Sequence, residues 1–191
     1  MSTKAKHKIL IIGDSHTRGI ASEIRLNRDN DFEIKGIVKP VSDLAAITHT
    51  VTRDTGALTE HDAIVVWGGT RDVSRNESQK GLCQIRKLVE RHSHTNVLVV
   101  NVPKRFDLET HCCVNYEVNA FNRKLDKHMK SFKNANTVEV TSDRDHYTKR
   151  GLHLNRKGKE EAAKTTVSSI KEIFKLQKKY LIKMSCKELI L

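Results

Sequence analysis

The sequence has few of the residues that mark disulfide-rich, metal-binding or membrane-spanning chains. Its 191 residues include 4 cysteines and 2 prolines. No two cysteines have the Cys-x-x-Cys spacing of a zinc site, so we expect reduced thiols and predict no metal and no cofactor. The polar amino terminus leads into only four consecutive aliphatic residues, Ile9 to Ile12, whereas a membrane span needs ~20. We therefore expect no membrane span and an intracellular protein, cytoplasmic or nuclear, that is not secreted.

Acidic and aromatic residues are also scarce. The chain has 23 Asp or Glu against 35 Lys or Arg, a net charge of +12, and only 5% aromatic residues. The excess is largest from Arg144 to Leu191, where 13 basic residues stand against 5 acidic ones. Such a stretch is a solvated helix face with a basic tail, or a contact with RNA or another polyanion. The low aromatic content leaves few stacking platforms for single-stranded bases.

Short apolar runs alternate with segments of helical spacing along the chain. The runs are the length of buried strands and are rich in β-branched residues. They cover residues 7–12, 32–38, 62–67, 96–102 and 136–140.

The spacing of apolar residues predicts helices around residues 82–89, 118–132 and 163–174, with less regular candidates at 16–26 and 43–54. Apolar strands that alternate with helices favour a parallel sheet covered on both faces. We therefore predict an α/β fold, a three-layer α/β/α sandwich with a five-stranded parallel sheet. The length fits one domain, which we expect at residues 1–175, followed by a basic C-terminal extension at 176–191.

The first predicted strand ends in Gly13-Asp14-Ser15-His16. Ligands of such sheets gather at the carboxyl ends of the strands. The glycine allows a sharp turn, and the serine falls at the start of a helix, near free amide donors. Ser15 is therefore a candidate nucleophile, or else an N-cap that satisfies the first helical turn.

Two further phrases fall at the same edge of the predicted sheet. The third strand ends in Trp67-Gly68-Gly69-Thr70-Arg71-Asp72, and Gly151-Leu152-His153-Leu154-Asn155 precedes the last helix. Asn155 is a candidate N-cap of that helix. His153 would then lie at the same rim as Ser15, where it could act as a general base.

These three phrases resemble the first, third and fifth sequence blocks of the SGNH hydrolase superfamily, also called GDSL-type esterases and lipases. Their order and spacing fit residues 8 to 175 of the chain. More narrowly, the stretches at 35–40, 65–70 and 151–159 resemble the SGNH-type domains of insect proteins and of transposable-element open reading frames. The resemblance implies the flavodoxin-like fold of SGNH hydrolases.

The resemblance also implies a serine esterase that hydrolyses small acyl or acetyl esters. Mapped onto this sequence, Ser15 is the nucleophile and His153 the base. The oxyanion would be held by the amide of Ser15 together with groups at Val41 and Arg71.

Three positions depart from the family pattern. Arg71 stands where the third block has asparagine, and Val41 stands where the second has glycine. If that position requires positive φ, a β-branched residue fits poorly. Arg150 replaces the acid three residues before the histidine, for which Asp143 or Asp145 could substitute. These changes predict a weak enzyme with an altered active site, or no enzyme at all.

The same substitutions support an alternative function. Arg71 and Arg150 would make the pocket mouth cationic, and Arg18 and Lys39 would extend that field. In this interpretation the chain is a non-catalytic SGNH-type domain that binds RNA or another anionic ligand through a basic surface. The oligomeric state stays open.

Overall fold

Five parallel strands form one sheet in the order β2-β1-β3-β4-β5. The computed structural model describes residues 6–26, 31–54, 58–140 and 143–188. The predicted α/β class and five-stranded parallel sheet are confirmed. The strands are β1 (His7–Gly13), β2 (Phe32–Val38), β3 (Ala63–Trp67), β4 (Asn96–Val100) and β5 (Ala135–Val138).

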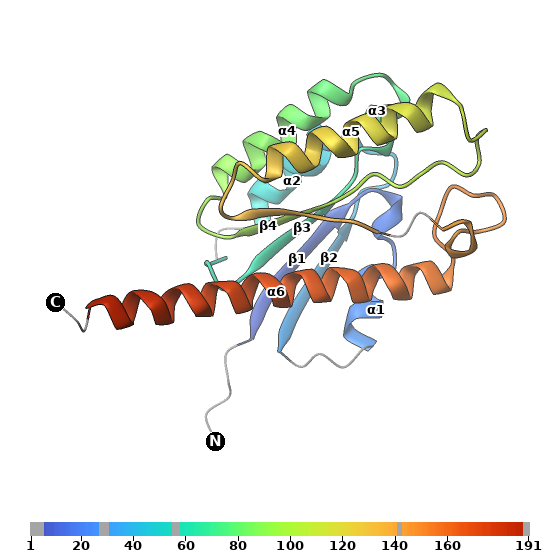
Figure 1. Ribbon diagram of the computed structural model, residues 1–191. Helices are drawn as coiled ribbons and strands as arrows, with labels where there is room; N and C mark the ends of the chain where they lie inside the picture. Colours follow the sequence, from blue (N-terminus) through green and yellow to red (C-terminus); the bar gives the residue numbers. More distant parts are fainter. Residues whose placement is uncertain (1–5, 27–30, 55–57, 141–142, 189–191) are drawn as a thin grey trace.

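Helices cover both faces of the sheet, so the molecule has three layers (Figure 1). Four helices pack on one face, α2 (Leu44–Asp54), α3 (Thr70–Ser74), α4 (Ser78–Arg91) and α5 (Cys113–Met129). Two pack on the other, α1 (Ile20–Leu26) and α6 (Arg156–Glu188). Two short 3-10 helices, η1 (Ser15–Thr17) and η2 (Arg144–His146), lie in the loops after β1 and β5.

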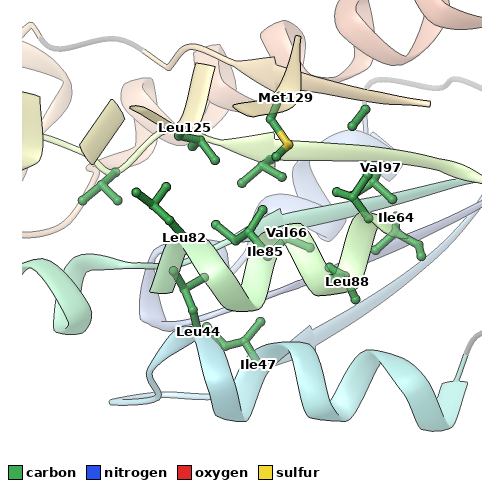
Figure 2. Packing of buried hydrophobic residues seen from close by; sticks show 14 of the residues in the cluster. Leu44, Ile47, Ile64, Val66, Leu82, Ile85, Leu88, Val97, Leu125 and Met129 are labelled. Carbon is green, nitrogen blue, oxygen red and sulfur yellow. The ribbon is translucent and has the colours of Figure 1, made fainter. Parts of the chain in front are cut away.

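The strands form these layers because successive side chains point to opposite faces of the sheet. In β1, Leu10 and Ile12 join the cluster under α2 and α4, while Ile9 and Ile11 join the cluster under α1 and α6. Apolar side chains on both sides therefore explain the continuous aliphatic run. Figure 2 shows the first cluster, with converging side chains that include Leu44, Ile47, Ile64, Val66, Leu82 and Ile85.

Gly13 ends β1 where the neighbouring strand comes closest. A Cβ atom at this position would lie 1.9 Å from the carbonyl oxygen of Trp67 and 2.4 Å from the Thr17 methyl carbon. The Asp14 N–H donates to the same Trp67 oxygen at 3.0 Å. The turn that places Ser15 at the sheet edge therefore requires glycine at position 13.

The helix expected over 16–26 is interrupted. Residues 15–17 form η1, and α1 begins only at Ile20, after Gly19 with φ +88°. Helix α3 was not predicted, because the Gly68-Gly69 pair indicated only a turn. The predicted helix over 118–132 ends earlier, at Met129.

Helix α6 continues without a break from Arg156 to Glu188, past the domain boundary expected at residue 175. Its C-terminal part extends beyond the sheet (Figure 1). The division into residues 1–175 and an extension stays a prediction. Across the part of the chain that the structure describes, no helix is both long and apolar enough to cross a membrane.

Replacing Gly13 with alanine should strongly destabilise the protein. The new methyl group would meet a backbone oxygen at 1.9 Å, so β1 and β3 would have to separate. We expect the free energy of unfolding to fall by about 3 kcal/mol or more in urea titrations. The matched control is Lys8→Ala, an exposed position of the same strand, which should stay within about 0.5 kcal/mol of the wild type. A Gly13→Ala protein as stable as this control would contradict the argument.

Candidate functional site

The candidate site lies at the carboxyl ends of β1 and β3, which are neighbours in the sheet. From β1 the chain passes to β2 on one side, and from β3 it passes to β4 on the other. The loops after the two strands therefore diverge and leave a crevice, where ligands bind in sheets of this kind. Ser15 follows β1 and Arg71 follows β3.

Ser15 is the first residue of η1, but it is not the cap of that helix. The Asp14 carboxylate takes that role by accepting a hydrogen bond from the His16 N–H at 2.9 Å. The capping alternative for Ser15 is therefore wrong. Among the described residues, neither the Ser15 hydroxyl nor its backbone N–H has a hydrogen-bond partner, so both are available to a ligand.

His16 joins the loop after β1 to the loop before α6. Its Nδ1 lies 3.0 Å from Asp14 Oδ1, and its Nε2 lies 3.0 Å from the carbonyl oxygen of Leu152. A carbonyl oxygen only accepts, so Nε2 donates to Leu152. Both ring nitrogens of this buried side chain therefore have partners.

His153 is held by a tight turn of the backbone. The Thr148 N–H donates to the His153 carbonyl at 2.8 Å, and the Gly151 N–H donates to the Thr148 carbonyl at 2.8 Å. Asn155 Oδ1 accepts from the Gly158 N–H at 3.0 Å, which confirms the predicted N-cap of α6. The turn and the cap together fix where His153 leaves the chain.

Ser15, His16 and His153 line two small cavities that meet at Ser15. One, of about 280 Å³, also contains Val41 and Arg71. The other, of about 200 Å³, lies toward α6. A larger hollow of about 580 Å³ lies beside α5 and β5 and contains none of these residues; we place the candidate site at Ser15 because the chemically competent groups converge there.

The imidazole of His153 faces that of His16, with ring centroids 5.1 Å apart. The side chain of His153 makes no hydrogen bond with the described residues, and the Ser15 hydroxyl is not bonded to it. Burial lowers the pKa of His153 below its ordinary value. The nearby charges of His16, Arg18 and Lys159 lower this pKa further, while Asp14 raises it. The neutral ring, which can accept a proton, is therefore favoured.

Val41 has the backbone conformation that favours glycine, with φ 58°. Its side chain is 74% exposed, so packing does not offset the cost of this conformation for a β-branched residue. The Val41 N–H has no partner among the described residues. Position 41 therefore has a positive φ, the conformation in which we expected a β-branched residue to fit poorly. Its N–H is free to bind an oxyanion.

Arg71 bridges the loops after β2 and β3. Its Nη1 donates to the Val41 carbonyl at 2.6 Å, and its other N–H groups have no partner among the described residues. The buried Asp72 carboxylate joins the same loops by accepting from the Leu44 N–H at 3.0 Å. Arg71 therefore crosses one side of the crevice instead of pointing into solvent.

Arg150 does not reach the site. Its side chain is exposed and lines neither cavity that contains Ser15. Asp143, considered as a substitute acid, caps η2 at Asp145 N–H and lies 3.9 Å from His146 Nδ1. No ion pair links His153 to a carboxylate in the described segments. The third member of a triad is not provided by these residues.

Sequence reasoning missed Arg105, from the loop after β4. Its guanidinium pairs with Asp107 through two hydrogen bonds of 2.7 Å and donates to Ser74 Oγ at 3.1 Å, at the wall of the larger site cavity. This pairing raises the pKa of Arg105 and lowers that of Asp107. No motif marks this loop, so only the folded chain reveals its contribution.

Comparisons with solved structures identify similar folds. The lipolytic G-D-S-L family protein of Veillonella parvula has 14% identity and a TM-score of 0.68, over 85% of this chain and 97% of that one. A GDSL-like lipase of Bacteroides thetaiotaomicron has 14% identity and a TM-score of 0.69, over 86% and 88%. The C-terminal catalytic domain of Streptococcus pneumoniae peptidoglycan O-acetyltransferase A has 10% identity and a TM-score of 0.69, over 91% and 97%.

No protein-family model matches the chain, and no curated protein matches it. The structural matches are all under 25% identical, so they show the fold and not the activity. The chain thus has the α/β fold of GDSL-type lipolytic hydrolases.

Replacing Val41 with glycine should relieve backbone strain. Val41→Gly should be more stable than Val41→Ala by about 1 kcal/mol in urea unfolding, because alanine keeps the cost of positive φ and glycine does not. The control pair is made at Val38, which ends β2 in extended backbone. There the order should reverse, with the glycine variant less stable than the alanine variant. The same order at both positions would refute strain at Val41.

Proposed function

We propose that the chain is a serine esterase of the SGNH type, with Ser15 as nucleophile and His153 as general base. The observation that carries the proposal is the pair's shared position, because both residues line both cavities at the switch point of a GDSL-type fold. The free hydroxyl of Ser15 and the pKa of His153, lowered by burial, suit these roles. We also propose that, among proteins with this fold, the chain is related more narrowly to the SGNH-type domains of insect and transposable-element proteins.

In the proposed reaction, the Ser15 hydroxyl oxygen attacks the ester carbonyl while His153 accepts the hydroxyl proton. The tetrahedral intermediate collapses to an acyl-serine, and His153 returns the proton to the leaving alcohol. A water molecule then attacks the acyl carbonyl while His153 accepts a proton from it. The acyl–Oγ bond breaks, the carboxylic acid leaves, and His153 returns the proton to the Ser15 oxygen. Small acyl or acetyl esters fit the size of the two cavities.

The oxyanion would be held by backbone N–H groups and a cation. The N–H groups of Ser15 and Val41 are both unpaired within the described chain, and Arg71 lines the same cavity. Arg71 replaces a neutral amide and is already bonded to the Val41 carbonyl. Loss of one oxyanion donor lowers turnover by ~10²-fold to 10³-fold, and loss of the orienting acid by ~10⁴-fold. We therefore propose a slow esterase.

The second candidate is a non-catalytic domain that binds RNA or another polyanion. It rests on the net charge of +12 and on the 13 basic against 5 acidic residues from Arg144 to Leu191. Of the two arginines expected at the pocket mouth, only Arg71 lines it, which weakens this candidate. Neither Arg150 nor Lys39 lines either site cavity. The Lys39 side chain donates to the Thr50 hydroxyl at 2.7 Å instead.

The esterase proposal predicts loss of hydrolysis on replacement of either residue. With 4-nitrophenyl acetate, Ser15→Ala should lower kcat/KM to the uncatalysed background, and His153→Asn should lower it by about 100-fold or more. The control is Ser131→Ala, a hydroxyl far from the site that bonds only its own helix end, which should leave the rate unchanged. An unchanged rate in Ser15→Ala would end the esterase proposal and leave the polyanion-binding alternative.

The pH dependence should report the pKa of His153. Only the neutral ring accepts the proton, so kcat/KM rises with pH as His153 loses its own proton. Because burial lowers that pKa, the midpoint of the acidic limb should lie below the ordinary value of 6.5. Initial rates between pH 4.5 and 8 measure the midpoint. A midpoint above the ordinary value would mean that a carboxylate orients the ring after all.

A further inference from the structure

The cavity on the α6 side of Ser15 has cationic walls and no acidic ones. Its volume is about 200 Å³, enough for several waters or one small charged group. Besides Ser15 and His153, its lining includes Arg18 and Lys159. Arg18 is the C-cap of η1, and Lys159 lies near the start of α6. The fold therefore brings together two cations from distant parts of the sequence.

Neither cation is neutralised by a described residue of the protein. Arg18 and Lys159 make no ion pair and no side-chain hydrogen bond with the described residues. Arg156, in the same first turn of α6, pairs with Glu160 at 3.1 Å. Asp14, which lines the adjoining cavity, is already engaged by His16 at 3.0 Å. The cavity therefore keeps two positive charges without a counter-charge.

Helix geometry makes this arrangement unfavourable without a ligand. The amino end of a helix carries partial positive charge, which favours acidic side chains in the first turn. The first turn of α6 has no acidic residue, and Lys159 points from it toward Gly19, with Nζ 3.7 Å from where a Cβ of that glycine would be. The charges of Arg18 and Lys159 reach the site, since both lower the pKa of His153 after burial and His16. An anion in the cavity would relieve this repulsion.

We propose that this cavity is an anion subsite, in which Arg18 and Lys159 bind a carboxylate, sulfate or phosphate group of the substrate while its ester carbonyl lies at Ser15. The inference rests on the proposed esterase function and names its substrate class, an ester that carries a negative charge a few atoms from the reacting carbonyl. The subsite recognises the negative charge, which lies on the acyl side or on the alcohol side of the ester.

Matched pairs of esters test the subsite and locate the charge. For the acyl side, mono-4-nitrophenyl glutarate is compared with neutral 4-nitrophenyl pentanoate. For the alcohol side, 4-acetoxybenzenesulfonate is compared with neutral 4-acetoxybenzenesulfonamide. We expect kcat/KM for one anionic ester to exceed that of its neutral partner by about 10-fold or more, with the advantage falling as salt rises. No advantage for either anionic ester would overturn the inference.

Variants assign the effect to the two cations. In the double variant Arg18→Gln, Lys159→Gln, the preference should disappear, with kcat/KM for the anionic ester falling to that of its neutral partner. The acidic limb of the pH profile should also move to higher pH, because two charges that lower the pKa of His153 are gone. The control is Lys157→Gln, an exposed lysine of the same helix that does not line the cavity. Equal loss on both esters would overturn the subsite.

A binding experiment separates this inference from the esterase proposal. Calorimetry with the Ser15→Ala protein measures glutarate and 4-hydroxybenzenesulfonate, the product anions, without turnover. One outcome is that an anion binds, that the double variant loses this binding, and that the wild type hydrolyses no ester. This outcome would support the subsite and end the esterase proposal. Hydrolysis without such binding and without preference for the anionic esters would do the reverse.

Discussion

The hydrogen-bonded link from Asp14 through His16 to the carbonyl of Leu152 is the contact on which the candidate site depends. It joins residues 136 positions apart in the chain and lies between the two residues that would react. Ser15 precedes His16, and His153 follows Leu152. Because His16 is buried and satisfied on both ring nitrogens, its orientation is fixed, and the distance between the loops after β1 and before α6 is fixed with it. His16 thus sets the spacing of these two loops.

A second contact closes the opposite side of the crevice. The guanidinium of Arg71 holds the Val41 carbonyl at 2.6 Å, and that bond keeps Val41 in a conformation more typical of glycine. The loop after β2 thus has a left-handed residue, which glycine would adopt more readily, at a β-branched side chain. Strain of this kind persists where surrounding contacts over-determine the chain, and here the contact is a charged hydrogen bond.

Charge at the site is distributed differently from charge in the sequence. The net charge of +12 is a property of the whole chain, and most of it lies on exposed surface, where ion pairs and solvent reduce its effect. Arg105 is matched by Asp107 and Arg156 by Glu160. Arg18, Lys159 and Arg71 are not matched by any described acidic residue, so the unbalanced charge next to Ser15 comes from three side chains that line its two cavities. The field at the candidate site depends on where charge is left unpaired more than on its total.

The layers and the positions of the loops that form the site follow from local sequence patterns. Apolar strands buried on both faces leave a strong local pattern, and the Gly13 turn and the Asn155 cap are local signals that the structure confirms. Tertiary structure alone decided which cations reach the cavity. Arg150, close to His153 in sequence, is exposed and lines neither cavity, while Lys159 reaches Gly19, which is 140 positions earlier in the chain. The reason is physical: secondary structure follows from near neighbours, whereas the field at a site depends on side chains that only the completed fold brings within a few ångströms.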